Sequence, residues 1–389
     1  MSLTIKHLNA DTTFLLTFTP FQPRDNTAPA GGRLPGSFSI LVDPWLSGVS
    51  QMWHPKFLTS KHTVASCVED LSQIPEPNLV LISQDKPDHC HARTLRQLNP
   101  DSTTTTIMAE PSAAKKIRAM KHFHPSNIFA LPSFSEKNPD SVIRFHVPPI
   151  VPHGLPGEVT VAFMPEKYDV SQLHNAIGIT YRPPSMGQIF SQQVSPRPAS
   201  SHTHIIPPSS LPSIPGSPAG DGRYTASSTG STSTSSGSTS HRSNSWSISS
   251  VGSSTCGGYH LPEKTLSVIY SPHGVNYSLL RNYASSHLVA STALPLTALL
   301  HSFDRVDNPW WMGGNVNQGL PGGVEIAQNL MARCWISAHD EEKENTGVSV
   351  MRTTIKKHTR DECQHMISRV RGDTSVQTLG VGQEICLKA

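Results

Sequence analysis

Short runs of aliphatic, β-branched and aromatic residues recur along this 389-residue chain and are separated by polar, glycine-containing or proline-containing stretches. Runs of this kind are typical of buried strands. The predicted strands are residues 13–18, 37–42, 78–82, 106–109 and 159–163. Helical patterns follow at residues 92–98, at 112–123 behind a cap at Ser112, and at 323–333. Because strands alternate with helices in both halves, the pattern predicts a layered α/β domain.

Two further predicted strands, residues 175–182 and 264–270, flank a long segment of different character. From Pro183 to Gly258 the chain is rich in serine, proline and glycine, and Asp221 is its only acidic residue. Such a segment buries too little apolar surface to offset an ordering cost of about 1–2 kcal/mol per residue. We therefore expect a disordered Ser/Pro-rich insert at 183–258, with residues 1–182 and 259–389 forming one core.

Composition agrees with this division, because hydrophobic residues make up only 36% of the chain and 33 residues are proline. The net charge of +3 is small and the basic residues are scattered, so we expect no nucleic-acid partner. Neither a signal-like amino terminus nor a bilayer-length apolar stretch is present, so we expect no membrane association. The six cysteines lie far apart and form no CxxC pair, which predicts free thiols in the cytoplasm or the nucleus.

The stretch richest in chemistry is the polar turn Gln84-Asp85-Lys86-Pro87-Asp88-His89, which directly follows a predicted strand. A scaffold exposes the residues at the carboxyl end of such a strand for chemistry. The carboxylate of Asp88 and the imidazoles of His89 and His91 are ligands that suit zinc or iron. The turn resembles the motif His-x-His-x-Asp-His of the metallo-β-lactamase superfamily.

Three other segments agree with this resemblance in their order along the chain. Residues 40–48, with Asp43, resemble the early aspartate-bearing strand of the ascorbate-6-phosphate lactonase-like branch. Residues 270–274 stand where that branch has a Ser-Gly-Asp-Thr turn, and residues 335–340 match the strand that carries the last ligand histidine. The resemblance implies an α/β fold, the metallo-β-lactamase-type four-layer αββα sandwich, interrupted by the long disordered insert.

The sequence also departs from the family at the first metal site. Gln84 and Lys86 stand where the family has two ligand histidines. The family's third histidine has no counterpart after strand 159–163 other than Glu166, which a surface role would also explain, or the more distant His174. We therefore expect the first site to bind no metal.

The resemblance implies that the second metal site is better kept. Asp88, His89 and His339 match its ligands, and His273 stands at the position of the bridging aspartate. Three or four nitrogen and oxygen ligands suffice for a catalytic zinc with an open water position. The expected cofactor is therefore one divalent metal ion, Zn²⁺ in the first instance.

Lys86 suggests a further role, since its ammonium would project to the place of the family's first cation. There it would neutralise Asp88 or stabilise an oxyanion. Lys86 and Asp88 are thus the predicted catalytic residues. On this hypothesis Lys86→Ala abolishes activity and leaves the metal content unchanged.

Each candidate ligand also has a plainer interpretation. Asp88 and His89 could cap a helix, His339 could be a half-buried histidine at a strand end, and His273 could be solvated in its turn. Asp43 is either a turn former or a carboxylate that orients a ligand imidazole.

Two features outside the motif have similar alternatives. Cys90 could be a thiolate ligand, but a small buried hydrophobic residue is the favoured interpretation. The pair Trp310-Trp311 could line a substrate pocket or pack in the core.

Two functions remain from the sequence. The first is a mononuclear metal-dependent hydrolase that cleaves a small-molecule ester, lactone or phosphoester by metal-bound water. The second is a catalytically silent protein of the same fold that binds a ligand or a protein partner, with the Ser/Pro-rich insert as the docking segment. Erosion of the first metal site favours the silent protein, and retention of Asp88, His89 and His339 favours the enzyme.

Overall fold

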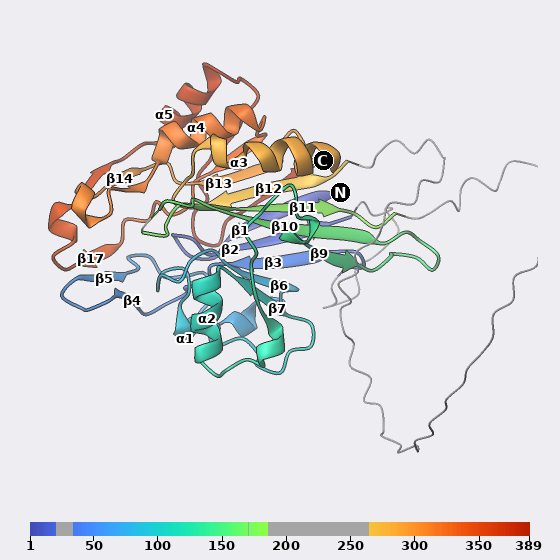
Figure 1. Ribbon diagram of the computed structural model, residues 1–389, viewed down its shortest axis with the longest axis horizontal. Coiled ribbons are helices and arrows are strands. Elements are labelled where there is room, and N and C mark those ends of the chain that lie inside the picture. The colour runs from blue at the N-terminus through green and yellow to red at the C-terminus, as the bar shows by residue number, and fades with distance from the viewer. Residues whose placement is uncertain (21–33, 170, 186–263) are drawn as a thin grey trace, which may run out of the picture. The chain divides into compact units, whose positions relative to one another are not determined.

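The computed structural model describes residues 1–20, 34–169, 171–185 and 264–389. The expected disordered insert at 183–258 therefore lies outside the described residues, apart from its first three positions. Within the described residues, two seven-stranded sheets form the centre of the fold (Figure 1).

The first sheet has the strand order β20-β1-β2-β3-β6-β7-β8. Its strands are β1 (Ser2–His7), β2 (Phe14–Thr19), β3 (Phe38–Val42), β6 (Leu79–Ile82), β7 (Thr106–Ala109), β8 (Ile128–Ala130) and β20 (Glu384–Lys388). The pairs β20/β1, β1/β2 and β2/β3 are antiparallel, whereas β3, β6, β7 and β8 run parallel. The loops after β3 and β6 therefore leave the sheet at the same edge.

The second sheet has the order β19-β16-β13-β12-β11-β10-β9. Its strands are β9 (Val142–Val147), β10 (Gly157–Pro165), β11 (Asn175–Arg182), β12 (Leu266–Ser271), β13 (Ala298–His301), β16 (Cys334–Ile336) and β19 (Ser375–Gln377). The two strands that flank the insert, β11 and β12, pair antiparallel as neighbours. From β12 to β19 the strands run parallel, so the loops after β12 and β16 also leave at one edge.

The inner faces of the two sheets pack on each other, and helices cover both outer faces. Along β10, Val159, Val161 and Phe163 enter the core between the sheets, while Ala162 and Met164 point to the helices. This is the alternation that a strand buried on both faces requires. Each large apolar side chain buried in this way contributes about 1.5–3 kcal/mol.

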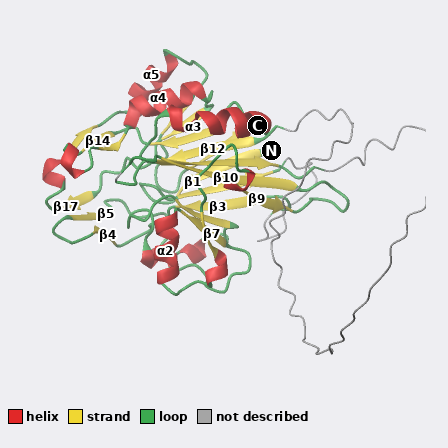
Figure 2. Ribbon diagram, viewed as in Figure 1, coloured by secondary structure: helices red, strands yellow, loops and turns green. Residues whose placement is uncertain are grey.

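The helices form the outer two layers. On the first sheet lie α1 (Ala92–Leu95) and α2 (Pro111–Ala119), and on the second lie α3 (Tyr277–Tyr283), α4 (Gly319–Asn329) and α5 (Arg360–Ser368) (Figure 2). The fold is therefore a four-layer αββα sandwich, the layering that the resemblance implied. None of the described helices is long and apolar enough to cross a bilayer.

The remaining described elements are two small sheets and several short helical turns. Two three-stranded sheets are built from β15 (Asn315–Asn317), β14 (Arg305–Asp307) and β18 (Thr354–Lys356), and from β17 (Glu344–Thr346), β5 (Leu58–Lys61) and β4 (Val49–Met52). The short helical turns are η1 (Leu71–Gln73), η2 (Pro125–Asn127), η3 (Pro139–Ser141), η5 (Ala284–Leu288), η6 (Trp310–Met312) and η7 (Val350–Arg352).

The structure corrects two sequence expectations and confirms a third. The cap of α2 is Glu110, whose carboxylate accepts the Ala113 N–H, and not Ser112. The interpretation that Trp310 and Trp311 pack in the core is wrong, because the two residues are 87% and 57% exposed. The favoured interpretation of Cys90 is confirmed, since it is buried and its burial raises the pKa of the thiol to about 12.

Candidate metal centre

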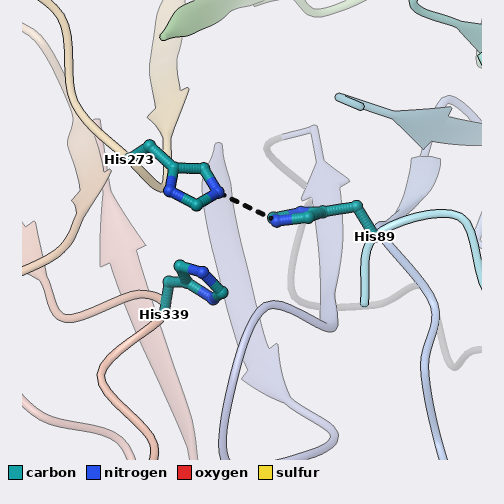
Figure 3. Close-up of side chains that lie close together, drawn as sticks. All are labelled: His89, His273 and His339. Carbon is teal, nitrogen blue, oxygen red and sulfur yellow. Dashed lines mark hydrogen bonds between the residues drawn. The ribbon is translucent and has the colours of Figure 1, made fainter. Parts of the chain in front are cut away.

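Five loops meet where the carboxyl ends of the strands of both sheets converge. Asp11 lies in the turn between β1 and β2, Asp43 directly after β3, His89 after β6, His273 after β12 and His339 after β16. Three of these side chains, His89, His273 and His339, point toward one another (Figure 3). One ring nitrogen of each lies within 4.8 Å of a ring nitrogen of the others.

Asp43 fixes the orientation of His89. Its buried carboxylate accepts four hydrogen bonds, from the Ser83 N–H at 2.7 Å, the Ser83 hydroxyl at 2.5 Å, the Tyr270 hydroxyl at 2.7 Å and His89 Nδ1 at 2.7 Å. Because a carboxylate only accepts, Nδ1 of His89 carries its proton toward Asp43. Of the two interpretations of Asp43, the structure supports the carboxylate that orients an imidazole.

His273 is fixed in the same way by two neutral acceptors. Its Nδ1 lies 2.6 Å from Asn317 Oδ1 and 3.1 Å from the Val316 carbonyl oxygen. Nδ1 therefore carries a proton, and the lone pair of Nε2 faces into the cluster. Burial, together with the neighbouring His339 and His89, holds the pKa of His273 well below its usual range, so this ring is neutral.

His339 obtains its orientation from Asp11. Its Nδ1 lies 2.9 Å from Asp11 Oδ1, so this nitrogen donates and leaves Nε2 free. Burial lowers the pKa of His339, and the opposing effect of Asp11 does not outweigh it. His339 is consequently a second neutral imidazole in the cluster, and neutral imidazole is the form that binds metals.

The central contact is between His89 and His273. Their Nε2 atoms are 3.1 Å apart although both rings have their Nδ1 protons committed elsewhere. Two lone pairs facing each other at this distance need a cation between them, either a proton or a metal ion. Burial alone would lower the pKa of His89, but Asp43 and Asp88 outweigh it and raise that pKa.

The donor set fits a divalent metal ion. Ligand nitrogens at about 2.0–2.1 Å from a tetrahedral zinc lie about 3.3 Å from one another, close to the observed separation. Each of the three imidazoles is held by an acceptor on its other nitrogen, as the ligands of a catalytic zinc are. In addition, Asp88 Oδ1 is buried and has no hydrogen-bond partner in the described part of the chain.

Asp88 belongs to a neighbouring group and not to the three histidines. Carboxylate oxygens of Asp11 and Asp88 and a ring nitrogen of His339 lie within 4.8 Å of one another. Beside them is Lys343, whose Nζ is 2.7 Å from Asp11 Oδ2 and 3.7 Å from Asp88 Oδ2. The four ligands expected from the sequence, Asp88, His89, His273 and His339, are therefore adjacent, but Asp88 is an ion-pair neighbour of a lysine.

The structure gives Lys86 a different partner from the expected one. Its ammonium bonds to Asp85 at 2.9 Å, with both side chains partly exposed, and the lysine beside Asp88 is Lys343. Gln84 is buried and donates to the Leu173 carbonyl oxygen. Neither residue takes part in the histidine cluster.

The weaker histidine candidates also have other roles. Both ring nitrogens of His174 face carbonyl oxygens, those of Gly274 and Asn315. His91 caps α1 and contacts Thr94. Glu166 is half-buried, and like these histidines it is absent from the metal-competent groups formed by described residues.

A cleft of about 360 Å³ reaches the centre from the solvent. Asp11 and His339 of the centre are among its lining residues, together with Asp304, His358 and Arg360.

No family model matches this sequence, and no curated protein matches it significantly. Igni18, a novel metallo hydrolase from the hyperthermophilic archaeon Ignicoccus hospitalis, is 9% identical over 100% of both chains with a TM-score of 0.42. The metallo-β-lactamase fold protein YhfI from Bacillus subtilis is 10% identical over 98% of this chain and 99% of its own, with a TM-score of 0.40. CmlA, a diiron β-hydroxylase from Streptomyces venezuelae, is 11% identical over 100% of this chain and 54% of its own, with a TM-score of 0.46. The αββα layering rests on the sheets and helices described above.

Proposed function

We propose that this protein is a mononuclear metal-dependent hydrolase whose single divalent ion is held by His89, His273 and His339. The observation that carries the proposal is the 3.1 Å contact between two imidazole Nε2 atoms, each with its Nδ1 bound to an acceptor. Two imidazole nitrogens arranged in this way can both bind a metal ion, because a cation between the two lone pairs removes their repulsion.

The charges around the cluster support one divalent ion. Asp11, Asp43 and Asp88 surround the histidines with three carboxylates, and Lys343 supplies one positive charge among them. Two negative charges remain, which a single M²⁺ would balance. Buried charges that are left unbalanced cost several kcal/mol, so the balance is a substantial term.

The roles of the side chains follow from their positions. A divalent ion bound here would supply Lewis-acid polarisation of a water molecule and of a substrate oxygen. Asp43, Asn317 and Asp11 hold the three rings in place through their Nδ1 atoms. Burial opposes ionisation of Asp88, but His89 and Lys343 outweigh it and lower the pKa of its carboxyl. Asp88 is thus an ionised carboxylate whose free Oδ1 can accept a proton from an attacking water.

The substrate class follows from the same chemistry. A carbonyl or phosphoryl oxygen is what a Lewis acid polarises, so the substrate is a small-molecule ester, lactone or phosphoester. Among these, the likeness of residues 40–48 to the ascorbate-6-phosphate lactonase-like branch favours a lactone. The five cysteines in the described part of the chain are free thiols, in keeping with the cytoplasm.

Metal content is the direct test. Elemental analysis of protein purified without chelators should give about one divalent metal ion per chain, and the double variant His89→Ala, His273→Ala should lose it. His124→Ala, at an exposed histidine outside the cluster, is the matched control and should keep the wild-type content. A screen with generic ester and phosphodiester substrates then tests turnover. A wild type that binds no metal would overturn the proposal.

One observation favours the catalytically silent protein instead. Because the pKa of His89 is raised, its Nε2 can carry a proton and donate it to His273, which satisfies both rings without a metal. On this alternative the site is a buried histidine pair in a ligand-binding or interaction module, and the Ser/Pro-rich insert docks a protein partner. A metal-free wild type that nevertheless has a fully folded, chelator-insensitive structure would support it.

A further inference from the structure

Within the described residues, Lys343 is the only lysine that an ion pair places beside the candidate centre, and its side chain is only partly exposed there. Its ammonium lies 2.7 Å from Asp11 Oδ2, 3.7 Å from Asp88 Oδ2 and 3.5 Å from His339 Nδ1. These three residues are also the second group of side chains that could hold a metal ion. The ammonium therefore lies beside each of the three residues of this group.

The surroundings hold this ammonium in place. Only 11% of the Lys343 side chain is exposed, and its Nζ also lies 5.6 Å from the centroid of the Trp45 ring, which is fully buried. An ammonium over an indole face gains a cation–π attraction in addition to its ion pairs. Lys343 thus has a fixed, charged position and is not a surface lysine that happens to approach.

A metal ion and this ammonium exclude each other. Two cations within about 4 Å repel by several kcal/mol even at an effective dielectric constant of about 20. The ammonium also engages Asp11 Oδ2 and neighbours Asp88 Oδ2, the hard oxygen ligands that Mg²⁺ and Mn²⁺ prefer. What remains open is the three-imidazole set, which suits zinc and similar transition metals better.

We propose that Lys343 is a built-in cation that fills the Asp11–Asp88–His339 group, limits the centre to one metal ion and restricts that ion to the three imidazoles. The second part of this inference rests on the proposed three-histidine metal site. The first part does not, because the ion pairs of Lys343 are present in the protein without any metal. Lys343 is accordingly a positioning residue, acting through Asp11 on the orientation of His339.

Mn²⁺ binding by a neutral variant tests the inference. Lys343→Met keeps an unbranched side chain one atom shorter and removes its charge, so the two carboxylates become free to bind a hard cation. We expect Mn²⁺ affinity to rise at least about tenfold over wild type, as removal of a neighbouring positive charge requires. Mn²⁺ can be followed by its electron paramagnetic resonance signal, which needs no turnover.

Three comparisons make the result specific. Lys86→Met removes a lysine whose partner is Asp85, so Mn²⁺ binding should stay at the wild-type level. Lys343→Met combined with Asp11→Asn should lose the gained site. Lys343→Arg keeps the positive charge and should gain no Mn²⁺ affinity.

Each outcome decides the matter. If Lys343→Met binds Mn²⁺ no better than wild type, or stays unfolded both with and without Mn²⁺, the inference is overturned. If it folds only when Mn²⁺ is added, the inference is supported, since the ion then replaces the ammonium. A wild type without zinc combined with a Lys343→Met variant that gains Mn²⁺ would overturn the proposed hydrolase site and leave the role of Lys343 standing.

Discussion

Two residues of the centre adopt backbone conformations that ordinary side chains avoid. Asp43 has a φ of 42° and His339 a φ of 69°, and neither is a glycine. Such left-handed positions cost about 1–3 kcal/mol each and persist where the surrounding structure enforces them. Here the four hydrogen bonds to Asp43 and the contact of His339 with Asp11 do so. The strain is therefore a mark of positioning and agrees with a functional centre.

The hydrogen bond from His89 to Asp43 leads to a prediction. Asp43→Asn keeps the size of the side chain but removes the negative charge that raises the pKa of His89 and fixes its Nδ1 proton. Metal affinity should fall by about 10–100-fold, as it does when such a partner of a ligand histidine is lost. Competition with a chelator measures this.

Asp70→Asn, at an exposed carboxylate that caps a short helix, is a suitable control and should leave the metal affinity unchanged. An Asp43→Asn protein that binds metal as tightly as wild type would show that Asp43 serves stability alone.

The sequence identified His89, His273 and His339, and it offered Asp43 as the carboxylate that orients an imidazole, but it did not identify Asp11, Asn317 or Lys343. Lys343 lies in the acidic run Asp340-Glu341-Glu342-Lys343-Glu344, which is typical of a solvated surface. Its partner Asp11 is 332 positions away, so no local pattern connects the two. By contrast, Lys86 lies within the motif and attracted a role that its bond to Asp85 does not support.

At the scale of elements, the prediction succeeded where the pattern was local. The predicted strands at 78–82 and 106–109 correspond to β6 and β7, whose residues are all buried except the half-buried Thr106. β20 was missed because its five residues gain their stability from pairing with β1 at the far end of the chain. α5 was missed although it carries a signal, the capping box between Thr359 and Glu362.

The packing of α4 on β16 gives a prediction at this scale. A Cβ at Gly323 would lie 2.0 Å from Cζ2 of Trp335, a fully buried side chain that cannot move aside. Gly323→Ala should therefore lower the free energy of unfolding by about 1–3 kcal/mol, although alanine in a helix normally stabilises by up to about 1 kcal/mol. Because β16 leads into the loop of His339, metal affinity should fall as well.

Urea denaturation checks the prediction for Gly323→Ala. The matched variant is Gly372→Ala, where a Cβ meets no atom within 4 Å and the stability should change little. Equal stability of the two variants would show that Trp335 adjusts without cost.

At the scale of the whole molecule, the centre exists only because both sheets are assembled. Its ligands come from the first third and the last third of the chain, and the two halves meet through the antiparallel pair β11 and β12 on either side of the insert. The resemblance placed these segments in one fold because it carries the order of the motifs. The distances between their side chains depend on packing of the two sheets, which the sequence does not display.

Buried histidines distributed over the whole molecule give it a predictable dependence on pH. Burial lowers the pKa of His91, His287 and His301 to about 4 in each case. In the unfolded chain these side chains titrate near the ordinary value of about 6.5. Below that pH the unfolded chain binds more protons than the folded protein does, so acid favours unfolding.

Stability should therefore be fully present above pH 6.5 and should fall as the pH decreases from 6.5 to 4, by up to about 1.4 kcal/mol per pH unit for each of the three histidines. Asp340 has the opposite effect on the pH dependence, since its burial raises its pKa to about 7.

Urea denaturation at a series of pH values measures the slope of stability against pH. His301→Gln removes a buried histidine whose Nε2 has no partner among the described residues. The slope of stability against pH should then decrease by up to about 1.4 kcal/mol per pH unit, the contribution of one proton. His124→Gln, at an exposed histidine, should leave the slope unchanged. A stability that rises on acidification from pH 6.5 to 4 would mean that these histidines are charged in the folded protein.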